Sequence, residues 1–164
     1  MEFPVKDTAR QDQLNSKADG YLDLEAMGQR ALAQHWVEVT PEEQKTFFDL
    51  MWKLIENIAY PKSNKFIGEY EISYPETHPS GNGFEVQSIV RQQAEGLDAK
   101  VVYHLYQKDN QWKIDDVVLD DVSIAEDLKY QFEKIIAQSK FSGLLDKMRE
   151  KLAQAEKENA GVPA

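Results

Sequence analysis

Two apolar stripes run along residues 41–58 and predict an amphipathic helix with a wide apolar arc. One stripe is Phe47, Met51, Leu54 and Ile58, and the other is Phe48, Trp52, Ile55 and Ala59. Both stripes have the three- and four-residue spacing of a helix face. Thr40-Pro41-Glu42-Glu43 is a capping box with proline at the first helical position, so it marks the start. Such a helix has neighbours on two sides or lines an interior space.

The same spacing predicts helices on both sides of this segment. One covers roughly Leu22–Trp36. Ser123-Ile124-Ala125-Glu126 is a second capping box. Its helix is expected to bury Leu128, Phe132, Ile135 and Ile136, and Ser139–Ser142 predicts a break. The last helix carries the stripe Phe141, Leu144, Leu145, Met148 and Leu152.

The middle of the chain has the composition of antiparallel strands. Four strands are predicted: Tyr70–Tyr74, Phe84–Val90, Ala99–Gln107 and Trp112–Leu119. Turn residues separate them at 79–83 and 108–111. The order of helices, sheet and helices predicts an α+β fold with the helices on one face of the sheet.

The chain shows no internal repeat or linker, which predicts one domain over residues 20–155. Residues 1–19 are polar and weakly patterned, so they are predicted to be flexible or weakly helical. Residues 156–164 end in Gly161-Val162-Pro163 and are predicted to be a disordered tail.

Composition narrows the classes of function. The 164 residues carry a formal net charge of −10, which argues against nucleic-acid binding and against adsorption to anionic lipid surfaces. The chain has no cysteine, and no apolar run approaches the length of about 18 residues that a membrane span needs. Met1-Glu2-Phe3-Pro4 lacks the pattern of a signal peptide. A cytosolic protein and a mature exported protein both remain open.

Candidate catalytic chemistry is sparse. No GxGxxG, P-loop, GxSxG or HExxH motif occurs, and the three histidines, His35, His78 and His104, are far apart. The pairs Asp115-Asp116 and Asp120-Asp121 could suggest a calcium site or an acid/base pair. Adjacent strand residues point to opposite faces, so Asp115 and Asp116 cannot share a site without a bulge. We therefore expect Asp116 to be a partly buried carboxylate satisfied by backbone donors, and no metal, cofactor or catalytic residue.

Five segments in order resemble the MlaC family, the toluene-tolerance (Tgt2) auxiliary proteins of ABC transporters. Trp112–Ile124 is similar to the family pattern W-k-v-y-D-v-x-v-x-G-v-S, and Lys129–Ile136 to R/K-x-Q-F-x-x-I-I. Ser142–Met148 resembles G-l-x-x-L, Ala31–Trp36 resembles a-L-G-x-x-W, and Thr40–Phe47 resembles t-x-x-Q-r-x-x-F. Together they cover residues 20–152. Ala33 and Asp121 stand where the family usually has glycine, Asp115 where it has an aromatic residue, and Lys129 where arginine is common.

The resemblance implies a monomeric periplasmic lipid carrier without catalysis, whose signal peptide has been removed. The family fold is a helical layer on a curved, mostly antiparallel sheet, similar to the NTF2-like arrangement. Acyl chains lie between sheet and helices, with the headgroup at the mouth. The carrier shuttles phospholipid between an outer-membrane lipoprotein complex and an inner-membrane MCE-domain ABC transporter, in support of outer-membrane lipid asymmetry.

An apolar wall suffices for such cargo. The two tails contain about 30 CH₂ groups, each worth roughly 0.8 kcal/mol when removed from water. The lipid-lining residues that we predict are Phe47, Met51, Leu54, Ile58, Val101, Tyr103, Leu105, Leu128 and Phe132. Val102 and Tyr106 put apolar groups on the other sheet face as well, so the pattern leaves the lining face open. The cations at 62, 65, 91, 100 and 129 are candidates for phosphate contact, although solvated surface charge is the commoner role.

Three alternatives remain. The cavity could carry another apolar lipid, such as a hopanoid. The chain could be an NTF2-like enzyme, with Asp116 and Tyr103 as the candidate pair. It could also be an interaction module with a closed core.

Overall fold

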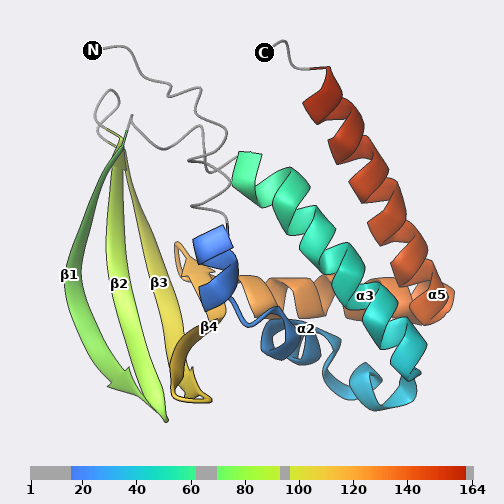
Figure 1. The fold of residues 1–164 in the computed structure, drawn as a ribbon, viewed down its shortest axis with the longest axis horizontal. Coiled ribbons are helices and arrows are strands. Elements are labelled where there is room, and N and C mark those ends of the chain that lie inside the picture. The colour runs from blue at the N-terminus through green and yellow to red at the C-terminus, as the bar shows by residue number, and fades with distance from the viewer. Residues whose placement is uncertain (1–15, 62–69, 93–96, 162–164) are drawn as a thin grey trace. The chain divides into compact units, whose positions relative to one another are not determined.

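The computed structural model describes residues 16–61, 70–92 and 97–161 (Figure 1). Within these ranges the chain forms two compact units where one domain was predicted. The sheet unit contains the described residues up to Asp23 and from Tyr70 to Ile124, and the helical unit contains Leu24–Pro61 and the described residues from Ala125 onward. The predicted α+β class is confirmed.

The sheet is a meander of antiparallel strands in the order β1-β2-β3-β4-β5. The strands are β1 (Tyr70–Ser80), β2 (Gly83–Gln92), β3 (Leu97–Lys108), β4 (Gln111–Leu119) and β5 (Val122–Ser123). The sequence predicted four of these strands. It missed the two-residue β5 and placed the end of β1 six residues too early. The long strands bend along their length (Figure 1).

Two-residue turns join β1 to β2, β3 to β4 and β4 to β5, and left-handed backbone conformations make them possible. Gly81 has φ 54° between β1 and β2, whereas both turn residues are left-handed at Asp109-Asn110 (φ 51° and 60°) and Asp120-Asp121 (φ 46° and 66°). Two consecutive positive φ values define the type I′ turn, whose twist matches that of the flanking strands. Asp and Asn tolerate this conformation better than other side chains.

Bulges in β1 and β4 determine which side chains share a sheet face. In the β3–β4 ladder His104 pairs with Asp116 but Leu105 pairs with Ile114, so Asp115 is an extra residue. Without it, the apolar residues before and after Asp115 would lie on opposite faces. The register therefore brings apolar side chains together on one face of the sheet, here called the apolar face. Its apolar members on the three central strands are Phe84, Val86, Val90, Ala99, Val101, Tyr103, Leu105, Trp112, Ile114, Val117 and Leu119, and the polar residues Ser88 and Gln107 lie on the same face.

The helical unit begins with α2 (Leu24–Leu32), which continues into the 3-10 helix η1 (Ala33–Glu38). The predicted capping box then starts α3 (Pro41–Leu54), with Thr40 Oγ1 accepting from Glu43 N at 3.3 Å and Thr40 N donating to Glu43 Oε2 at 2.9 Å. A π-helical turn, η2 (Ile55–Ala59), follows. The predicted helix over 22–36 begins only at Leu24, because Leu22 forms a bridge to Ile114, and it changes to a 3-10 helix at Ala33. Residues 16–21 form a separate helical turn.

The last helix, α5 (Ile124–Ala160), contains the predicted break. Lys140 has φ 60° and ψ −178°, so α5 is two helices joined at a kink. Helix continues through Ala160, which places residues 156–160 in regular structure where a disordered tail was predicted.

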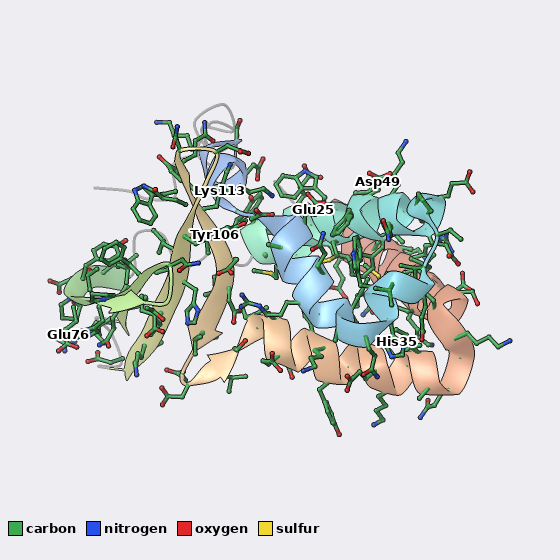
Figure 2. The ribbon with its side chains drawn as sticks, turned by 90° about the horizontal axis from the view of Figure 1, so that it is seen from below. Glu25, His35, Asp49, Glu76, Tyr106 and Lys113 are labelled. Atoms are coloured by element: carbon green, nitrogen blue, oxygen red, sulfur yellow. The ribbon has the colours of Figure 1, made fainter. Side chains whose placement is uncertain are left out.

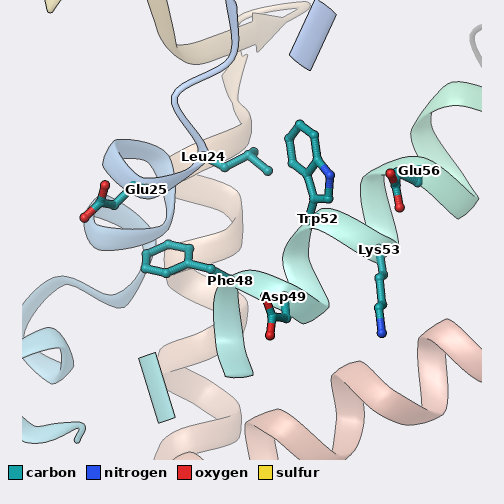
Figure 3. Close-up of a pocket in the computed structure, with 7 residues that line it drawn as sticks. All are labelled: Leu24, Glu25, Phe48, Asp49, Trp52, Lys53 and Glu56. Carbon is teal, nitrogen blue, oxygen red and sulfur yellow. The ribbon is translucent and has the colours of Figure 1, made fainter. Parts of the chain in front are cut away.

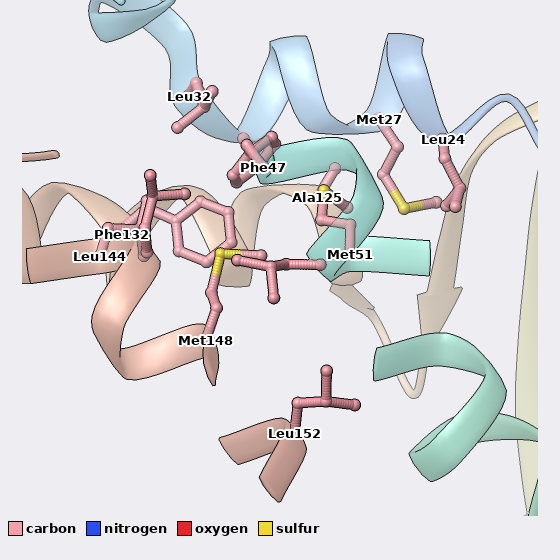
Figure 4. Close-up of a cluster of buried hydrophobic side chains, with 13 residues drawn as sticks. Leu24, Met27, Leu32, Phe47, Met51, Ala125, Phe132, Leu144, Met148 and Leu152 are labelled. Atoms are coloured by element: carbon pink, nitrogen blue, oxygen red, sulfur yellow. The ribbon is translucent and has the colours of Figure 1, made fainter. Parts of the chain in front are cut away.

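The core of the helical unit is a cluster of side chains from α2, α3 and α5 (Figure 4). Phe47 lies at its centre with no exposed surface, and its ring makes an edge contact with Phe132 at 5.7 Å between centroids. Leu144, Leu145, Met148 and Leu152 of the last apolar stripe are buried in the same cluster, as predicted. Gly28 in α2 lies so close to α3 that a Cβ there would be 2.7 Å from a ring carbon of Phe48.

Ala33 directly follows α2 with φ 48°, the left-handed conformation in which glycine usually ends a helix. We predict that Ala33→Gly raises the free energy of unfolding by about 0.5–1 kcal/mol. Glycine removes about 1–2 kcal/mol of strain that alanine has in the left-handed conformation. This gain exceeds the roughly 0.4–1 kcal/mol that glycine costs because it raises the conformational entropy of the unfolded chain. Urea denaturation measures the change. Ala26→Gly within α2 is the control and should lower stability by about 1 kcal/mol.

At Gly28 two effects of opposite sign compete. Replacing a helical glycine by alanine normally stabilises by about 1 kcal/mol, but overpacking a core costs about 1–3 kcal/mol. Phe47 is fully buried and its ring carbon would lie 2.9 Å from the new Cβ, so the neighbours have little room to yield. We predict a net loss of about 1–2 kcal/mol for Gly28→Ala in thermal or urea unfolding. Gly20→Ala, with nothing within 4 Å of the new Cβ, should be neutral or stabilising. A stabilised Gly28→Ala protein would contradict the close packing of α2 and α3.

Candidate functional site

The predicted lining residues of the helical unit belong mainly to its core. Phe47, Met51 and Phe132 are buried in the core cluster, and Leu54 and Leu128 pack against it partly buried. Ile58 lies half-buried in η2, outside the cluster. The structure therefore brings five of these six residues together.

The predicted lining residues of the sheet unit are neighbours on the apolar face. Val101, Tyr103 and Leu105 alternate along β3 and are all half-buried. Their cross-strand partners in β2 are Ser88, Val86 and Phe84. The register shows only which β3 residues share the apolar face, and the opposite face of β3 carries Lys100 and His104 beside Val102 and Tyr106. Their role as lipid contacts stays a prediction.

The helical unit also has a groove of about 650 Å³ between α2 and α3 (Figure 3). Leu24, Phe48 and Trp52 form its apolar part, and Figure 3 shows the side chains of Leu24 and Trp52 pointing toward one another. Its charged lining residues are Glu25, Asp49, Lys53 and Glu56. Phe48 and Trp52 belong to the second apolar stripe of α3, which was not among the predicted lining residues. The sequence signal for the groove was the width of the apolar arc of α3: one stripe enters the core, and the other lines the groove.

Three of the five candidate phosphate contacts hold ion pairs, and Lys62 and Lys65 lie outside the described residues. Arg91 binds Asp98 through two hydrogen bonds of 2.8 Å, Lys100 contacts Asp121 at 3.0 Å, and Lys129 contacts Glu126 at 3.3 Å. The hydrogen bonds with Arg91 lower the pKa of the Asp98 carboxyl, and the same contacts raise the pKa of Arg91. These cations are engaged within the chain.

Asp116 was predicted to be partly buried and satisfied by backbone donors; it is buried, and one of its two donors is a side-chain hydroxyl. It is 3% exposed and accepts from Val117 N at 2.8 Å and from the Ser123 hydroxyl at 2.5 Å. The candidate pair of Asp116 and Tyr103 is wrong, because Asp116 pairs with His104 and Tyr103 pairs with Val117, which puts the two side chains on opposite faces. Asp115 and Asp116 were expected not to share a site without a bulge, and Asp115 is a bulge residue, so that objection no longer applies. No cluster of three or more potential metal ligands occurs among the described residues.

A buried contact that the sequence did not indicate ties the residues before α2 to the sheet. Asp23 is 6% exposed and accepts from Tyr106 Oη at 2.5 Å and from Lys108 Nζ at 2.8 Å. Both donors belong to β3, and Tyr106 is labelled in Figure 2. More than 80 residues separate the partners in sequence. Lys113 also donates to the carbonyl of Gly20 at 2.6 Å. A carboxylate this far from its partners gives no local sequence signal.

Comparison with known proteins identifies a matching family and a solved structure of similar fold. A family model described as MlaC protein matches residues 2–150. A solved structure with similar fold is a phospholipid-binding protein from Ralstonia solanacearum in complex with a phospholipid. The two share 22% sequence identity at a TM-score of 0.78, over 90% of this chain and 83% of the other. No match was found among curated proteins. None of the described helices combines the length and apolarity needed to cross a membrane.

The hydrogen bond between Ser123 and Asp116 generates a stability prediction. Ser123→Ala removes a donor from a buried carboxylate, which should lower the free energy of unfolding by about 1–3 kcal/mol. Thermal unfolding of the full chain measures the loss. Ser73→Ala on the exposed strand β1 is the control, expected to stay within about 0.5 kcal/mol of the parent. Equal stability of the two variants would mean that the carboxylate does not depend on Ser123.

Proposed function

Since this chain belongs to the MlaC family, we propose that it is a periplasmic carrier that binds the acyl chains of phospholipid and moves lipid between membranes. The observation that carries the proposal is the apolar face of the sheet. Ile72 on β1 pairs with Val90 and extends this face to the open edge of the sheet. Its large apolar members are substantially exposed, with 52% of Ile72, 47% of Leu119 and 40% of Trp112 accessible.

A surface of this kind has a physical use in lipid transport. Large contiguous apolar patches on a protein surface generally mark binding sites. Each CH₂ group that leaves water for an apolar wall gains roughly 0.8 kcal/mol, so a carrier needs coverage of the tails more than strong contacts to the headgroup. Val101, Tyr103 and Leu105 lie at the middle of the face and are the acyl-chain contacts that we propose for the sheet unit. For the helical unit, the half-buried residues Leu54, Ile58 and Leu128 are the predicted contacts with free surface, whereas Phe47, Met51 and Phe132 support them from the core.

Charge supports the shuttle role. A net charge of −10 disfavours lingering at anionic membrane surfaces, so delivery would depend on specific protein partners. We propose the partners that the family implies, an outer-membrane lipoprotein complex and an inner-membrane MCE-domain ABC transporter. The protein would act as a monomer, with phospholipid as cargo and no cofactor or catalytic step.

Mass spectrometry of the intact protein under native conditions tests the class of function. Purified protein should carry an added mass that organic extraction identifies as phospholipid. An extracted hopanoid or other lipid would keep the carrier and change its cargo. A protein that is empty as purified and stays empty after incubation with liposomes would overturn the proposal and favour an interaction module.

Two substitutions on adjacent residues of β3 test the binding face. Val101 lies on the apolar face and Val102 on the opposite one, and both are half-buried. A carboxylate in contact with hydrocarbon is strongly unfavourable, so Val101→Glu should lower lipid occupancy roughly tenfold or more. Val102→Glu introduces the same charge into the same strand and should retain lipid. Circular dichroism and Tm verify that both variants fold, and occupancy follows from native mass spectra. Equal occupancy in the two folded variants would contradict the assignment of the face.

A further inference from the structure

The groove between α2 and α3 carries charges of both signs that have no partner within the described part of the chain. Asp49, Lys53 and Glu56 are exposed, and none of their side chains forms an ion pair or a hydrogen bond with another described residue. Other exposed charges of the helical unit do form ion pairs. On α5, Lys147 pairs with Glu150 at 2.9 Å and Arg149 pairs with Asp146 at 2.8 Å.

Spacing alone would allow the groove charges to pair. Asp49 precedes Lys53 by four residues, the favourable order for an acid and a base on one helix face. The side chains nevertheless extend separately, and Figure 3 shows Asp49 and Lys53 projecting from α3 on the side away from Trp52. Glu56 lies in the π-helical turn η2, and π-helical turns occur frequently at functional sites. The groove thus presents an ammonium group flanked by two carboxylates along the edge of an apolar floor.

We propose that this groove binds the zwitterionic headgroup of a phospholipid and selects it over an anionic headgroup, an inference that rests on the proposed function. Lys53 supplies an ammonium group for the lipid phosphate. Asp49 and Glu56 supply carboxylates for the cationic amine. Leu24 and Phe48 contact the apolar atoms next to the headgroup.

Charge complementarity decides the occupant. Around the groove three carboxylates face one lysine, because Glu25 is also among the lining residues. Glu25 accepts from Gln29 at 3.4 Å, so we assign the amine to Asp49 and Glu56. A phosphatidylglycerol headgroup carries a phosphate and no cation, so it would leave these carboxylates uncompensated beside a negative charge. A phosphatidylethanolamine headgroup satisfies both signs. Repulsion of the anionic lipid contributes as much to selection as attraction of the zwitterionic lipid.

The test loads the full-length protein from vesicles that contain phosphatidylethanolamine and phosphatidylglycerol in equal amounts with matched acyl chains. Native mass spectrometry and extraction give the total lipid load and the ratio of the two headgroups. Exposed ion pairs are individually weak, so we expect phosphatidylethanolamine to be enriched about fivefold in the parent protein. The enrichment should decrease at high salt, which screens exposed charges.

Variants separate local recognition from net charge. Asp49→Asn combined with Glu56→Gln should bring the ratio to within about twofold of the vesicle, because phosphatidylethanolamine loses its amine contacts and phosphatidylglycerol loses the repulsion. The matched control, Asp146→Asn combined with Glu150→Gln, changes net charge equally on α5 and should keep the enrichment. Lys53→Gln should weaken binding of both lipids and leave their ratio unaltered, because both carry the phosphate.

The outcomes distinguish this inference from the proposed function. A loaded parent protein whose lipid ratio equals that of the vesicle would overturn headgroup selection and leave the carrier function standing. A loss of enrichment in the α5 control as large as that in the groove variant would assign the effect to net charge and also overturn it. A parent protein that takes up neither lipid would overturn the proposed function itself. All variants change exposed side chains, and circular dichroism checks their folding.

Discussion

The close contact of α2 with α3 at Gly28 is the constraint on which the helical unit depends. With no side chain at Gly28, α2 lies directly against Phe47 and Phe48 of α3. This contact divides the two apolar stripes of α3. Phe47 and Met51 enter the core, where α5 covers them, and Phe48 and Trp52 remain at the groove. A Cβ at Gly28 would force α3 away and alter core and groove together.

In the sheet unit the extra residue at Asp115 has a comparable effect. The chain alternates correctly for one face up to Ile114 and again from Val117, but with the opposite phase. One inserted residue restores a common face for both halves of β4. The next residue, Asp116, then points to the other side, where the hydroxyl of Ser123 binds it. The family pattern has an aspartate at this position, and in the structure its hydrogen bond with Ser123 connects β4 to β5.

The charges of the molecule divide into two groups with different consequences. Several described cations, such as Arg91, Lys100 and Lys108, hold carboxylates within their own unit, so they are poorly placed to attract an external phosphate. At the groove, the side chains of Asp49, Lys53 and Glu56 form no ion pair with another described residue. Free charges of both signs beside an aromatic floor are what a zwitterionic headgroup requires, whereas the apolar sheet face makes no distinction between headgroups. The sheet unit thus offers an apolar face, and the helical unit offers unpaired charges of both signs.

The sequence by itself determined the structural features that depend only on residues close together in the chain. The Thr40 capping box, the break near Lys140, the hairpin turns and the buried stripe of the last helix all follow from spacing within a few residues. The ordered family motifs, including the positions of Ala33 and Asp121 where glycine is usual, were also visible in the sequence, and both residues prove to have positive φ. Only the tertiary structure decided which stripe of α3 lines a groove, which sheet face is apolar throughout, and which charges are free. These depend on contacts between residues far apart in the chain, such as Gly28 with Phe48, Asp23 with Tyr106, and the register of β3 against β4, for which no local pattern exists.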